Sequence, residues 1–557
     1  MLTPEKDIAT TRAAFRWQVP DRYNIGADIC DRHADAAPDA LAIIDVGRDG
    51  QAQEVTYRAL REMSDRLANA LSRTEVRGAR IAVLLPQCTQ TAAAHIAITK
   101  MGCISLPLFT LFGPDALRHR LRDSGASAVI TDTSGARMLA DLRGDLPDLS
   151  RVLCIDGPVA GAEDFDAALA AASARFTALD TAADDPAILI YTSGTTGAPK
   201  GALHAHRVLL GHLPGVEMSH DFFPQAGDRI WTPADWAWIG GLLDVLMPAL
   251  HHRVPVVACR FDKFTAEAAF DLIRRFGIRN AFLPPTALKM MRLATPEAPV
   301  PMRSVASGGE TLGRELIAWG RQVFGTTINE FYGQTECNMI VSSCAALAPA
   351  EPGVMGFAVP GHDVEVIDEG ARRLCTMGEE GSIAVRAPDP VMFLGYWNNP
   401  AATADKFLRI GEADWLLTGD KGCKTPSGRI RFIGRDDDII SSGGYRIGPA
   451  EIEDCLLTHP AVQLAGVVGS PDPVRGSVVA AYVKLADGFA PSDALAARIA
   501  AHVKSRLAAY EYPRIVRFVD MMPMTTTGKI IRATLRAMAE EEAQHLRPDA
   551  PSSKSAL

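Results

Sequence analysis

The chain has few features of a metal-binding, disulfide-bonded or nucleic-acid-binding protein. Its 557 residues include ten cysteines, but no two are spaced as Cys-x-x-Cys and no Cys/His cluster has zinc-ligand spacing. This cysteine usage predicts a reduced, cytoplasmic setting. The formal net charge of -9 argues against a broad basic surface, so we expect no nucleic-acid partner. A local basic pocket for a nucleotide is still compatible with this charge.

Long apolar segments are also missing. Residues 1–12 carry charges and lack the apolar core of a secretory signal. The most apolar stretch, residues 236–250, is short for a membrane span and is interrupted by Asp244 and Pro248. It predicts a buried helix, and we expect no integral membrane segment. Residues 547–557 are rich in Pro and Ser and are expected to form a disordered tail, whose last residues only loosely resemble a peroxisomal address.

Apolar strands alternate with amphipathic helices along most of the chain. Strand patterns such as residues 80–86 and 187–191 alternate with helical patterns such as residues 57–73 and 264–276. This alternation predicts an α/β fold with two open, mostly parallel sheets. Short strands in the Gly-rich residues 353–387 predict a small antiparallel, barrel-like unit.

A second change in composition occurs where Gly and Asp become frequent, at residues 434–448. The residues that follow have one helical pattern over residues 449–457, two strand patterns and a longer helical pattern over residues 491–507. We therefore expect a domain boundary near residues 435–437 and a small α+β domain after it.

The first chemical motif follows a buried strand and is rich in Gly and hydroxyl residues. It reads Tyr-Thr-Ser-Gly-Thr-Thr-Gly-Ala-Pro-Lys-Gly from Tyr191 to Gly201. Gly194 and Gly197 would let backbone N–H groups approach a polyphosphate, and Lys200 would add a cation. The GxxxxGK[ST] pattern of a Walker A loop is not met, and a polar connector is the alternative. Hydroxyl donors in this loop come from Thr192, Ser193, Thr195 and Thr196.

This string resembles the phosphate loop of the adenylate-forming superfamily, which includes acyl-CoA synthetases, nonribosomal-peptide adenylation domains and luciferases. The resemblance covers nearly the whole chain, because later motifs follow in the family's order and spacing. Among the branches, the chain is most similar to acetyl- and medium-chain acyl-CoA synthetases. The resemblance implies ATP, Mg²⁺ and coenzyme A, and a small-molecule carboxylic acid that is converted first to acyl-AMP and then to a thioester.

The second motif reads Asn-Glu-Phe-Tyr-Gly-Gln-Thr-Glu and ends at Glu336. The ring of Tyr332 could stack on adenine, and the carboxylate of Glu336 could bind Mg²⁺ on phosphates. The resemblance implies these roles and a contact of Thr335 with the α-phosphate, although a surface strand edge is the alternative. Cys337 follows the motif and could be a nucleophile, but no activating base is readable beside it. The resemblance places further motif residues in the ATP site: Glu330, Phe331, Gly333 and Gln334.

Two shorter motifs are weak signals alone, but their position between the longer motifs supports a role in ligand binding. The adjacent glycines before Glu310 permit close ligand approach, and the resemblance places Gly309 and Glu310 beside adenine and the acyl group. Asp420, after Thr-Gly, and Arg435 could hold ribose hydroxyls by charge-assisted hydrogen bonds. Read alone, the first motif could be a plain loop and the second a turn.

The resemblance also assigns roles after the predicted boundary. It implies a hinge at residues 435–437, with Asp437 as pivot, between an N-terminal domain of residues 1–434 and a mobile C-terminal domain of residues 438–546. Lys529, in Thr-Thr-Thr-Gly-Lys, would be catalytic together with Lys200 and Thr335. The residues assigned to coenzyme A are Gly443, Gly444, Tyr445, Arg446 and Arg475.

Some of these assignments have plain alternatives. The three acidic residues around Asp437 could be a solvated turn, and Arg446 and Arg475 could be surface residues. Gly443 stands where relatives often have Ser. Many relatives have a basic residue near Met524, and this chain has none there, which leaves Lys529 intact.

The acid that is activated depends on the pocket walls. Trp236 and Trp238 could line an acyl pocket with Gly309 and Gly333, or they could be core residues. Acetate-specific relatives often carry Trp where this chain has Gly333, so we expect a deeper pocket for a medium-chain fatty acid or a small aryl acid. The alternatives are transfer of the acyl group to a carrier protein, a luciferase-like oxygenase and a catalytically silent nucleotide binder. The sequence does not predict the oligomeric state.

Overall fold

The computed structural model describes most of the chain and divides it into two compact units. The first unit is Met1–Glu365, Ala384–Thr418 and Gly428–Ile430, and the second is Val366–Ile383, Gly419–Ser427 and Arg431–Leu557. The described residues are 2–192, 199–261, 263–294, 296, 298–310, 312–351, 353–435, 438–442, 445–472, 475–507, 511–525 and 528–545. The tail predicted at residues 547–557 lies outside them, as do the side chains of residues 441, 445, 446, 451, 544 and 545.

One mixed sheet of the first unit has the strand order β20-β9-β8-β4-β3-β5-β6-β7 among the described residues. Its strands are β3 (Arg80–Leu84), β4 (Ile104–Pro107), β5 (Ala128–Thr131), β6 (Arg151–Cys154), β7 (Glu163–Asp164), β8 (Pro186–Thr192), β9 (Lys200–Ala205) and β20 (Gly395–Tyr396). Neighbours from β8 to β7 in this order are parallel, whereas β9 is antiparallel to β8 and β20.

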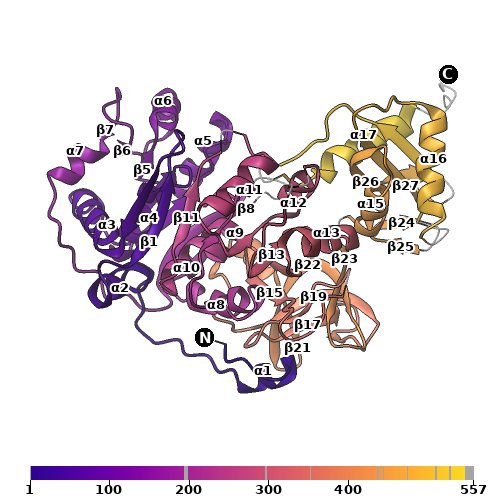
Figure 1. Ribbon diagram of the computed structural model, residues 1–557, viewed down its shortest axis with the longest axis horizontal. Helices are drawn as coiled ribbons and strands as arrows, with labels where there is room; N and C mark the ends of the chain where they lie inside the picture. Colours follow the sequence, from indigo (N-terminus) through magenta and orange to yellow (C-terminus); the bar gives the residue numbers. More distant parts are fainter. Residues whose placement is uncertain are drawn as a thin grey trace, which may run out of the picture. The chain divides into compact units, whose positions relative to one another are not determined.

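Helices cover both faces of this sheet. Successive side chains of β3 point to opposite faces, and the apolar side chains on each face pack against helices. Ile81 and Val83 pack with α3 (Tyr57–Leu71) and α4 (Thr89–Lys100). Ala82 and Leu84 pack with α5 (Pro114–Ser124) and α6 (Thr133–Leu142). The sequences of these strands are continuous apolar runs because both of their faces are buried. Figure 1 shows where these helices lie around the sheet.

A second mixed sheet of the first unit has the order β16-β15-β14-β13-β12-β10-β11-β1-β2 in the part of the chain that is described. Its strands are β1 (Leu41–Val46), β2 (Ala52–Thr56), β10 (Ile230–Trp231), β11 (Val256–Cys259), β12 (Asn280–Phe282), β13 (Ser304–Gly308), β14 (Ile328–Gln334), β15 (Asn338–Ser342) and β16 (Phe357–Ala358). One face packs against α11 (Ala266–Arg275), α12 (Pro285–Arg292) and α13 (Arg314–Phe324).

The other face of this sheet shares one core with the first sheet. That core contains residues of α8 (Val208–Ser219), of β8 and β11, and of the apolar segment formed by α9 (Ile239–Gly241), η3 (Leu242–Leu246) and α10 (Met247–His251). The apolar stretch is thus a buried helical segment, as its length predicted. No helix in the described ranges is long and apolar enough to span a bilayer.

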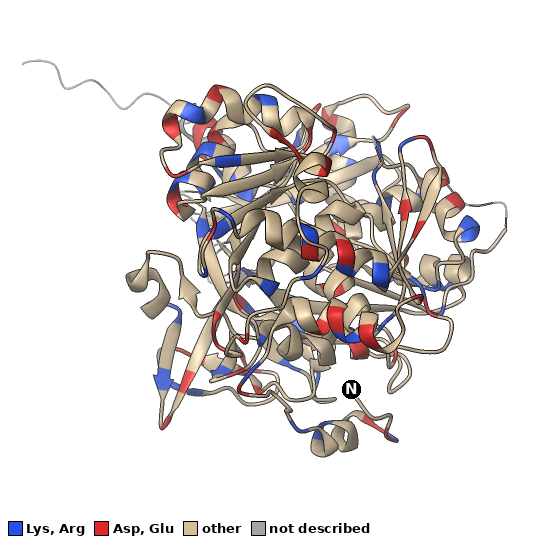
Figure 2. Ribbon diagram, turned by 90° about the vertical axis from the view of Figure 1, so that its left-hand side faces the viewer, with Lys and Arg blue, Asp and Glu red and all other residues tan. Residues whose placement is uncertain are grey.

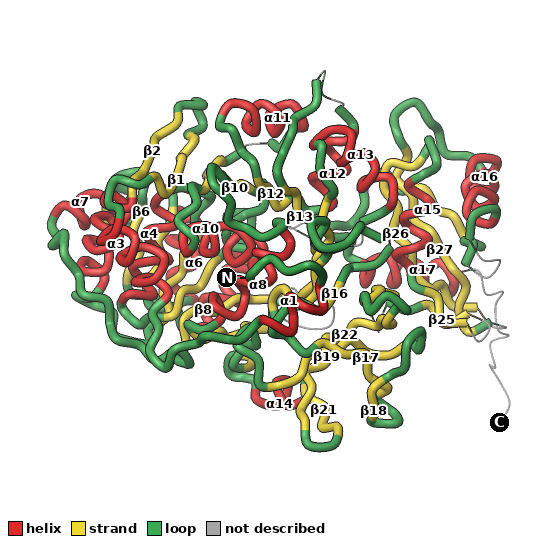
Figure 3. Tube along the Cα trace, turned by 60° about the horizontal axis from the view of Figure 1, so that its bottom comes forward, coloured by secondary structure: helices red, strands yellow, loops and turns green. Residues whose placement is uncertain are grey.

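The strands β18-β17-β19-β22-β21 form the antiparallel, barrel-like sheet, in which β23 also pairs with β22. Their bounds are β17 (Val364–Asp368), β18 (Arg373–Leu374), β19 (Glu380–Ala387), β21 (Phe407–Ile410), β22 (Ala413–Lys424) and β23 (Ile430–Arg435). Figure 3 shows these strands connected mainly by loops. The boundary between the two units passes through this sheet.

The second unit also contains a small α+β sheet with the order β25-β24-β27-β26, and β28 pairs with β27. These strands are β24 (Ile440–Ser442), β25 (Tyr445–Ile447), β26 (Val462–Asp472), β27 (Gly476–Leu485) and β28 (Ile515–Phe518). On one face lie α15 (Pro449–Leu457) and α16 (Asp493–Lys504), and on the other lies α17 (Arg532–His545). The predicted fold class is confirmed. Basic and acidic residues are interspersed along the ribbon (Figure 2).

Further short helices connect these elements: α1 (Ile8–Ala14), η1 (Ala27–Asp31), α2 (Arg32–Ala36), η2 (Arg143–Asp145), α7 (Phe165–Ala170) and α14 (Pro400–Ala404).

Candidate functional site

Both ends of the predicted phosphate loop lie side by side on antiparallel strands. Thr192 at the end of β8 pairs with Lys200 at the start of β9, and the Thr192 hydroxyl donates to the Lys200 carbonyl at 3.3 Å. Residues 193–198 of the loop lie outside the described part of the chain. The predictions for Ser193, Gly194, Thr195, Thr196 and Gly197 therefore stay predictions.

The strand end before the loop is held by buried polar contacts. The Tyr191 hydroxyl donates to Asp123 at 2.5 Å, and burial, with this carboxylate next, raises the pKa of Tyr191. A Cβ added to Gly201 would lie 3.2 Å from the Tyr191 ring and 3.3 Å from Trp397. A side chain at position 201 would therefore be tightly packed against both residues, and glycine avoids this crowding.

Lys200 and Glu336 meet around one tyrosine. The Lys200 ammonium lies 5.2 Å from the centroid of the Tyr396 ring, and the Tyr396 hydroxyl donates a short hydrogen bond to the Glu336 carboxylate. The Phe393 N–H donates to the Glu336 carbonyl at 2.9 Å. Burial, reinforced by Glu336, raises the pKa of Tyr396, so its hydroxyl stays a donor at neutral pH. The predicted phosphate cation and the predicted metal ligand thus lie in one cluster.

Tyr396 is absent from the residues that the sequence indicated. It lies on β20, which pairs with β9 through Tyr396 and Ala202, although the two strands are far apart in the chain. A short strand of this kind carries no local pattern that shows its partner. Only the pairing brings Tyr396 to Lys200 and Glu336.

The second motif covers the end of β14 and the turn into β15. Thr335 is half-buried in that turn, and the side-chain amide of Gln334 donates to the Thr418 carbonyl at 2.7 Å. Glu330 is buried and accepts from the Leu312 N–H at 3.4 Å. Tyr332 is half-buried.

The alternative role for Cys337 as a nucleophile has no support in the structure. Its side chain is completely buried. Burial, with Glu336 next, raises the pKa of the Cys337 thiol, so the reactive thiolate is disfavoured.

Aromatic side chains gather where the acyl pocket was predicted. The ring centroid of Phe282 lies 5.6 Å from that of Trp238 and 5.2 Å from that of Phe331. Trp238 is half-buried, whereas Trp236 is completely buried in the core. The chain approaches Phe331 at Gly308, where an added Cβ would lie 2.5 Å from the ring.

The two glycines predicted at the acyl pocket differ in their surroundings. Gly309 is exposed on the described surface, next to Glu310, whose carboxylate lies 3.4 Å from Lys289. A Cβ at Gly333 would lie 1.5 Å from the Asn338 carbonyl oxygen across a bulge between β14 and β15. A side chain at position 333 would therefore require the pairing of β14 with β15 to shift.

The second unit brings the predicted ribose residues together. The Asp420 carboxylate on β22 is buried and lies 3.7 Å from the Arg435 guanidinium on β23. Gly419 before it has a φ of +80°, a conformation that residues with a side chain rarely adopt. Gly419 and Asp420 lie within β22 rather than in the turn that the sequence indicated, and the pairing of β22 with β23 brings Asp420 to Arg435.

Lys529 lies in a closed turn before α17. The Lys529 N–H donates to the Thr525 hydroxyl at 3.0 Å, and the Lys529 carbonyl accepts from the Thr525 N–H at 2.7 Å. Met524 and Ile530 form an antiparallel bridge on either side. The lysine is half-buried.

The predicted hinge and coenzyme A residues are described only in part. Asp437, Gly443 and Gly444 lie outside the described residues, and the side chains of Tyr445 and Arg446 do too. The backbone of residues 445 and 446 belongs to β25, which pairs with β24. Arg475 is exposed, and its N–H donates to Asp472 at 2.8 Å at the start of β27.

Comparison with known proteins gives the family. A family model described as AMP-binding enzyme matches residues 30–397, and one described as AMP-binding enzyme C-terminal domain matches residues 451–529. The chain belongs to the AMP-binding enzyme family. The prediction of an adenylate-forming enzyme of the acid–CoA ligase class is thereby confirmed.

Relatives of this AMP-binding enzyme match over nearly their whole length. Acetyl-coenzyme A synthetase of Bacillus subtilis is 32% identical, with 93% of this chain and 90% of that protein covered. Acyl-coenzyme A synthetase ACSM2 of Rattus norvegicus, a mitochondrial protein, is 33% identical, with 93% and 92% covered. The solved structure of the anthranilate CoA ligase AuaEII in complex with anthranoyl-AMP has a TM-score of 0.86 and 27% identity, covering 95% of this chain and 99% of that one.

The donor set of the AMP-binding enzyme fits a weakly held Mg²⁺. Among the described residues, no group of three or more His, Cys, Asp and Glu side chains could hold a metal ion. Glu336 supplies one buried carboxylate, oriented by Tyr396. A single hard oxygen ligand suits Mg²⁺, which usually keeps several waters and binds substrate phosphates.

Proposed function

We propose that this chain activates a medium-chain fatty acid or a small aryl acid with ATP, forming acyl-AMP and pyrophosphate, and then transfers the acyl group to coenzyme A. The observation that supports this most is the cluster of Lys200, Tyr396 and Glu336. It joins the end of the phosphate loop to the predicted metal ligand within one unit.

In the first step a carboxylate oxygen attacks the α-phosphorus and pyrophosphate leaves. Carboxylates are weak nucleophiles, so catalysis consists mainly of alignment and charge stabilisation. Lys200 would offset charge on the phosphates, and Thr335 would donate to the α-phosphate. Glu336 would hold Mg²⁺, which supplies further charge compensation when bound.

The second unit would contribute the ribose contacts and the catalytic lysine. Asp420 would accept hydrogen bonds from the ribose hydroxyls, and the contact of its buried carboxylate with the exposed Arg435 guanidinium supports this orientation. Lys529 would bridge the carboxylate and the α-phosphate, and the hydrogen-bonded turn around it supports a fixed position for its backbone. Asp437 would be the pivot of a rotation that removes Lys529 from the reaction site and brings residues 443–446 there to bind coenzyme A. Arg475 would be a further coenzyme A contact.

Two features support an acid longer than acetate. Position 333 has no side chain, and half-buried Trp238 packs beside Phe282 as an aromatic wall. The neighbouring ligase solved with anthranoyl-AMP acts on an aryl acid. Coenzyme A is favoured over a carrier protein as acceptor because the relatives named above are CoA synthetases. A cytoplasmic location stays a prediction, supported by ten free cysteines.

Pyrophosphate exchange into ATP tests the first step. The wild-type enzyme is assayed with acetate, butyrate, octanoate and benzoate, with and without coenzyme A. We expect exchange with octanoate or benzoate to exceed exchange with acetate. A preference for acetate over the other three would overturn the assigned acid, and no exchange with any acid of a broader panel would overturn the function.

The two half-reactions are separated with Lys529→Ala. This variant should lose adenylate formation by about a hundredfold or more, as expected when an aligned electrostatic donor is removed. It should still form thioester from supplied acyl-AMP and coenzyme A. Equal loss of both half-reactions would contradict the separate roles of Lys529 and the coenzyme A segment.

A further inference from the structure

Arg532, the first residue of α17, lies between the buried carboxylate of Asp438 and the half-buried carboxylate of Glu453 in the second unit. Its guanidinium contacts Glu453 on α15 twice, at 2.5 Å and 3.2 Å. It also contacts Asp438 at 3.4 Å. The side chains of Asp438 and Glu453 are 4% and 12% exposed. We call these three residues the Arg532 clamp.

Each carboxylate of the clamp is held by a second donor. Glu453 also accepts from the Val467 N–H of β26 at 2.8 Å. Asp438 also accepts from Arg536, one turn further along α17, at 2.5 Å. The clamp therefore links the start of α17 to both α15 and strand β26 of the small sheet.

The clamp connects the two segments that carry predicted ATP contacts. The Asp438 N–H donates to the Arg435 carbonyl at 3.0 Å, so Asp438 is bound to the end of the strand that bears Arg435. On the other side, Arg532 follows Lys529 by three residues, directly after the turn closed by Thr525.

We propose that Arg532 and Asp438 are positioning residues for Lys529, which hold the catalytic turn in register with Arg435 during adenylate formation. The inference rests on the proposed role of Lys529. A lysine that bridges a carboxylate and a phosphate must hold its position closely, since a displacement of about 1 Å can cost about a hundredfold in rate. Arg532 contacts neither reactant in this scheme and acts only through the turn.

The test uses Arg532→Met, Asp438→Asn and the conservative Arg532→Lys. We expect Arg532→Met to lower the kcat of pyrophosphate exchange about ten- to hundredfold, with acyl transfer from supplied acyl-AMP to coenzyme A within twofold of wild type. Arg532→Lys keeps the charge but not the contact with both carboxylates. Its kcat for pyrophosphate exchange should therefore lie between those of wild type and Arg532→Met. The matched control is Arg517→Met, because Arg517 pairs with Glu542 near the other end of α17 at 2.8 Å and should leave both half-reactions unchanged.

A double-mutant cycle separates positioning from general damage. If Arg532 acts through Lys529, Arg532→Met should cause no further loss of exchange in the Lys529→Ala background. A further tenfold loss in that background, or normal exchange in Arg532→Met, would overturn the proposal.

Amide hydrogen exchange provides a readout that does not depend on turnover. The amides of Gly528 and Lys529 donate hydrogen bonds within the turn, so Arg532→Met should accelerate their exchange at least tenfold, whereas Arg517→Met should not. Unchanged protection in Arg532→Met would also refute positioning. A wild-type protein without pyrophosphate exchange would refute the proposed function instead, and the amide measurement would still decide whether Arg532 holds the turn.

Discussion

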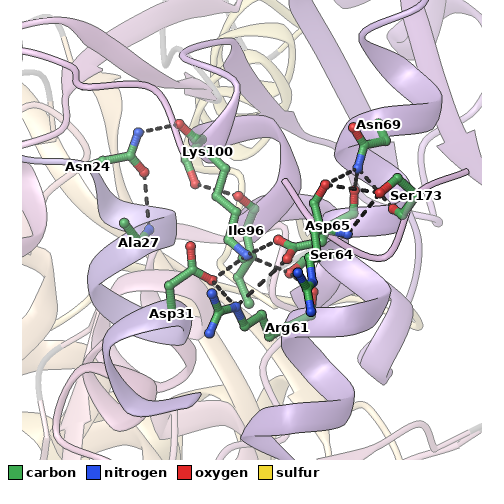
Figure 4. A network of polar contacts seen from close by, with 12 residues as sticks. Asn24, Ala27, Asp31, Arg61, Ser64, Asp65, Asn69, Ile96, Lys100 and Ser173 are labelled. Carbon is green, nitrogen blue, oxygen red and sulfur yellow. Dashed lines mark hydrogen bonds and ion pairs between the residues drawn. The ribbon is translucent and has the colours of Figure 1, made fainter. Parts of the chain in front are cut away.

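Lys100 is the centre of a buried charge network in the first unit, and its replacement gives a sharp stability prediction. The side chain is completely buried, and its ammonium lies 2.5 Å from Asp31, 2.8 Å from Asp65 and 3.0 Å from the Ser64 hydroxyl. Arg61 lies 3.8 Å from each of the two carboxylates. These side chains come from η1, α3 and α4, so the network ties three helical segments together (Figure 4).

Lys100→Met keeps much of the apolar volume but removes the charge. Among the described residues, Arg61 is then the one remaining ion-pair partner of these two carboxylates. Breaking a buried ion pair in this way costs about 3–5 kcal/mol of unfolding free energy. Arg58→Met on the same helix is the control, because Arg58 and Asp39 are 63% and 79% exposed. Loss of that exposed pair should cost less than about 1 kcal/mol.

The defect of Lys100→Met should shrink in acid. Burial lowers the pKa of Lys100, but Cys30, Asp31 and Asp65 oppose this effect and leave the pKa raised. The contribution of the ammonium to the unfolding free energy is therefore complete below the unfolded pKa of about 10.4 and is lost only above that pH. Burial raises the pKa of Asp31, a shift that Lys100 opposes. Without the ammonium this pKa rises further, and a carboxyl whose folded pKa exceeds its unfolded value gains stability as pH falls. The difference in unfolding free energy between Lys100→Met and wild type should therefore become smaller as the pH falls from about 7.5 to about 5.

Urea unfolding followed by tryptophan fluorescence measures this effect in the relevant unit. All seven tryptophans belong to the first unit, so their emission does not report on the second. Adding Asp31→Asn and Asp65→Asn to Lys100→Met should recover part of the loss, because no buried charge is then unpaired. A cost below about 1 kcal/mol for Lys100→Met, or a difference that stays constant in acid, would refute the reasoning.

Three further predictions concern the candidate site. Tyr396→Phe removes the hydrogen bond to Glu336 and should raise the Mg²⁺ concentration for half-maximal pyrophosphate exchange about tenfold or more. A hydrogen bond to a charged group contributes about 1.5–3 kcal/mol, and about 1.4 kcal/mol is a factor of ten. An unchanged Mg²⁺ titration would contradict this prediction. Asp420→Asn should raise the KM for ATP about tenfold and leave the KM for the acid unchanged, because a charge-assisted bond to ribose is weakened; an effect on the acid alone would contradict the ribose assignment. Excess EDTA should stop exchange and added Mg²⁺ should restore it, while the urea midpoint without substrates stays the same, since in the described ranges no cluster of ligands holds an ion in the fold; a lowered midpoint would indicate a structural metal.

Local sequence patterns predicted many of the helices and strands, because their apolar residues recur at regular spacing and Gly and Pro mark their ends. The pattern at residues 449–457 coincides with α15 (Pro449–Leu457), where Gly448 caps the helix and Pro449 begins it. The apolar run at residues 187–191 becomes β8, whose inner residues are buried. These features depend on neighbours within a few residues, so one sequence is sufficient to find them.

Long-range pairing could not be predicted in this way. The hairpin of β1 and β2 at the N-terminal end joins the second sheet by pairing with β11, and β20 joins the first sheet by pairing with β9. Which distant strand a segment pairs with depends on the packing of the whole sheet rather than on the pattern within the segment. Tyr396 and the Lys100 network were missed for this reason, although every residue in them is visible in the sequence.

Gly333 illustrates how one residue can satisfy two physical requirements. Because acetate-specific relatives often have Trp at this position, the sequence predicts that the missing side chain leaves a deeper acyl pocket. In the structure, a Cβ would lie 1.5 Å from the Asn338 carbonyl oxygen, so the bulged pairing of β14 with β15, as it stands in this chain, also fits only glycine at position 333. Acid selectivity should therefore depend also on the aromatic wall of Trp238, Phe282 and Phe331, whose rings pack together beside this strand. A Gly333→Trp variant would consequently disturb β15 as well as the pocket, whereas Trp238→Ala changes the wall without requiring the backbone to move.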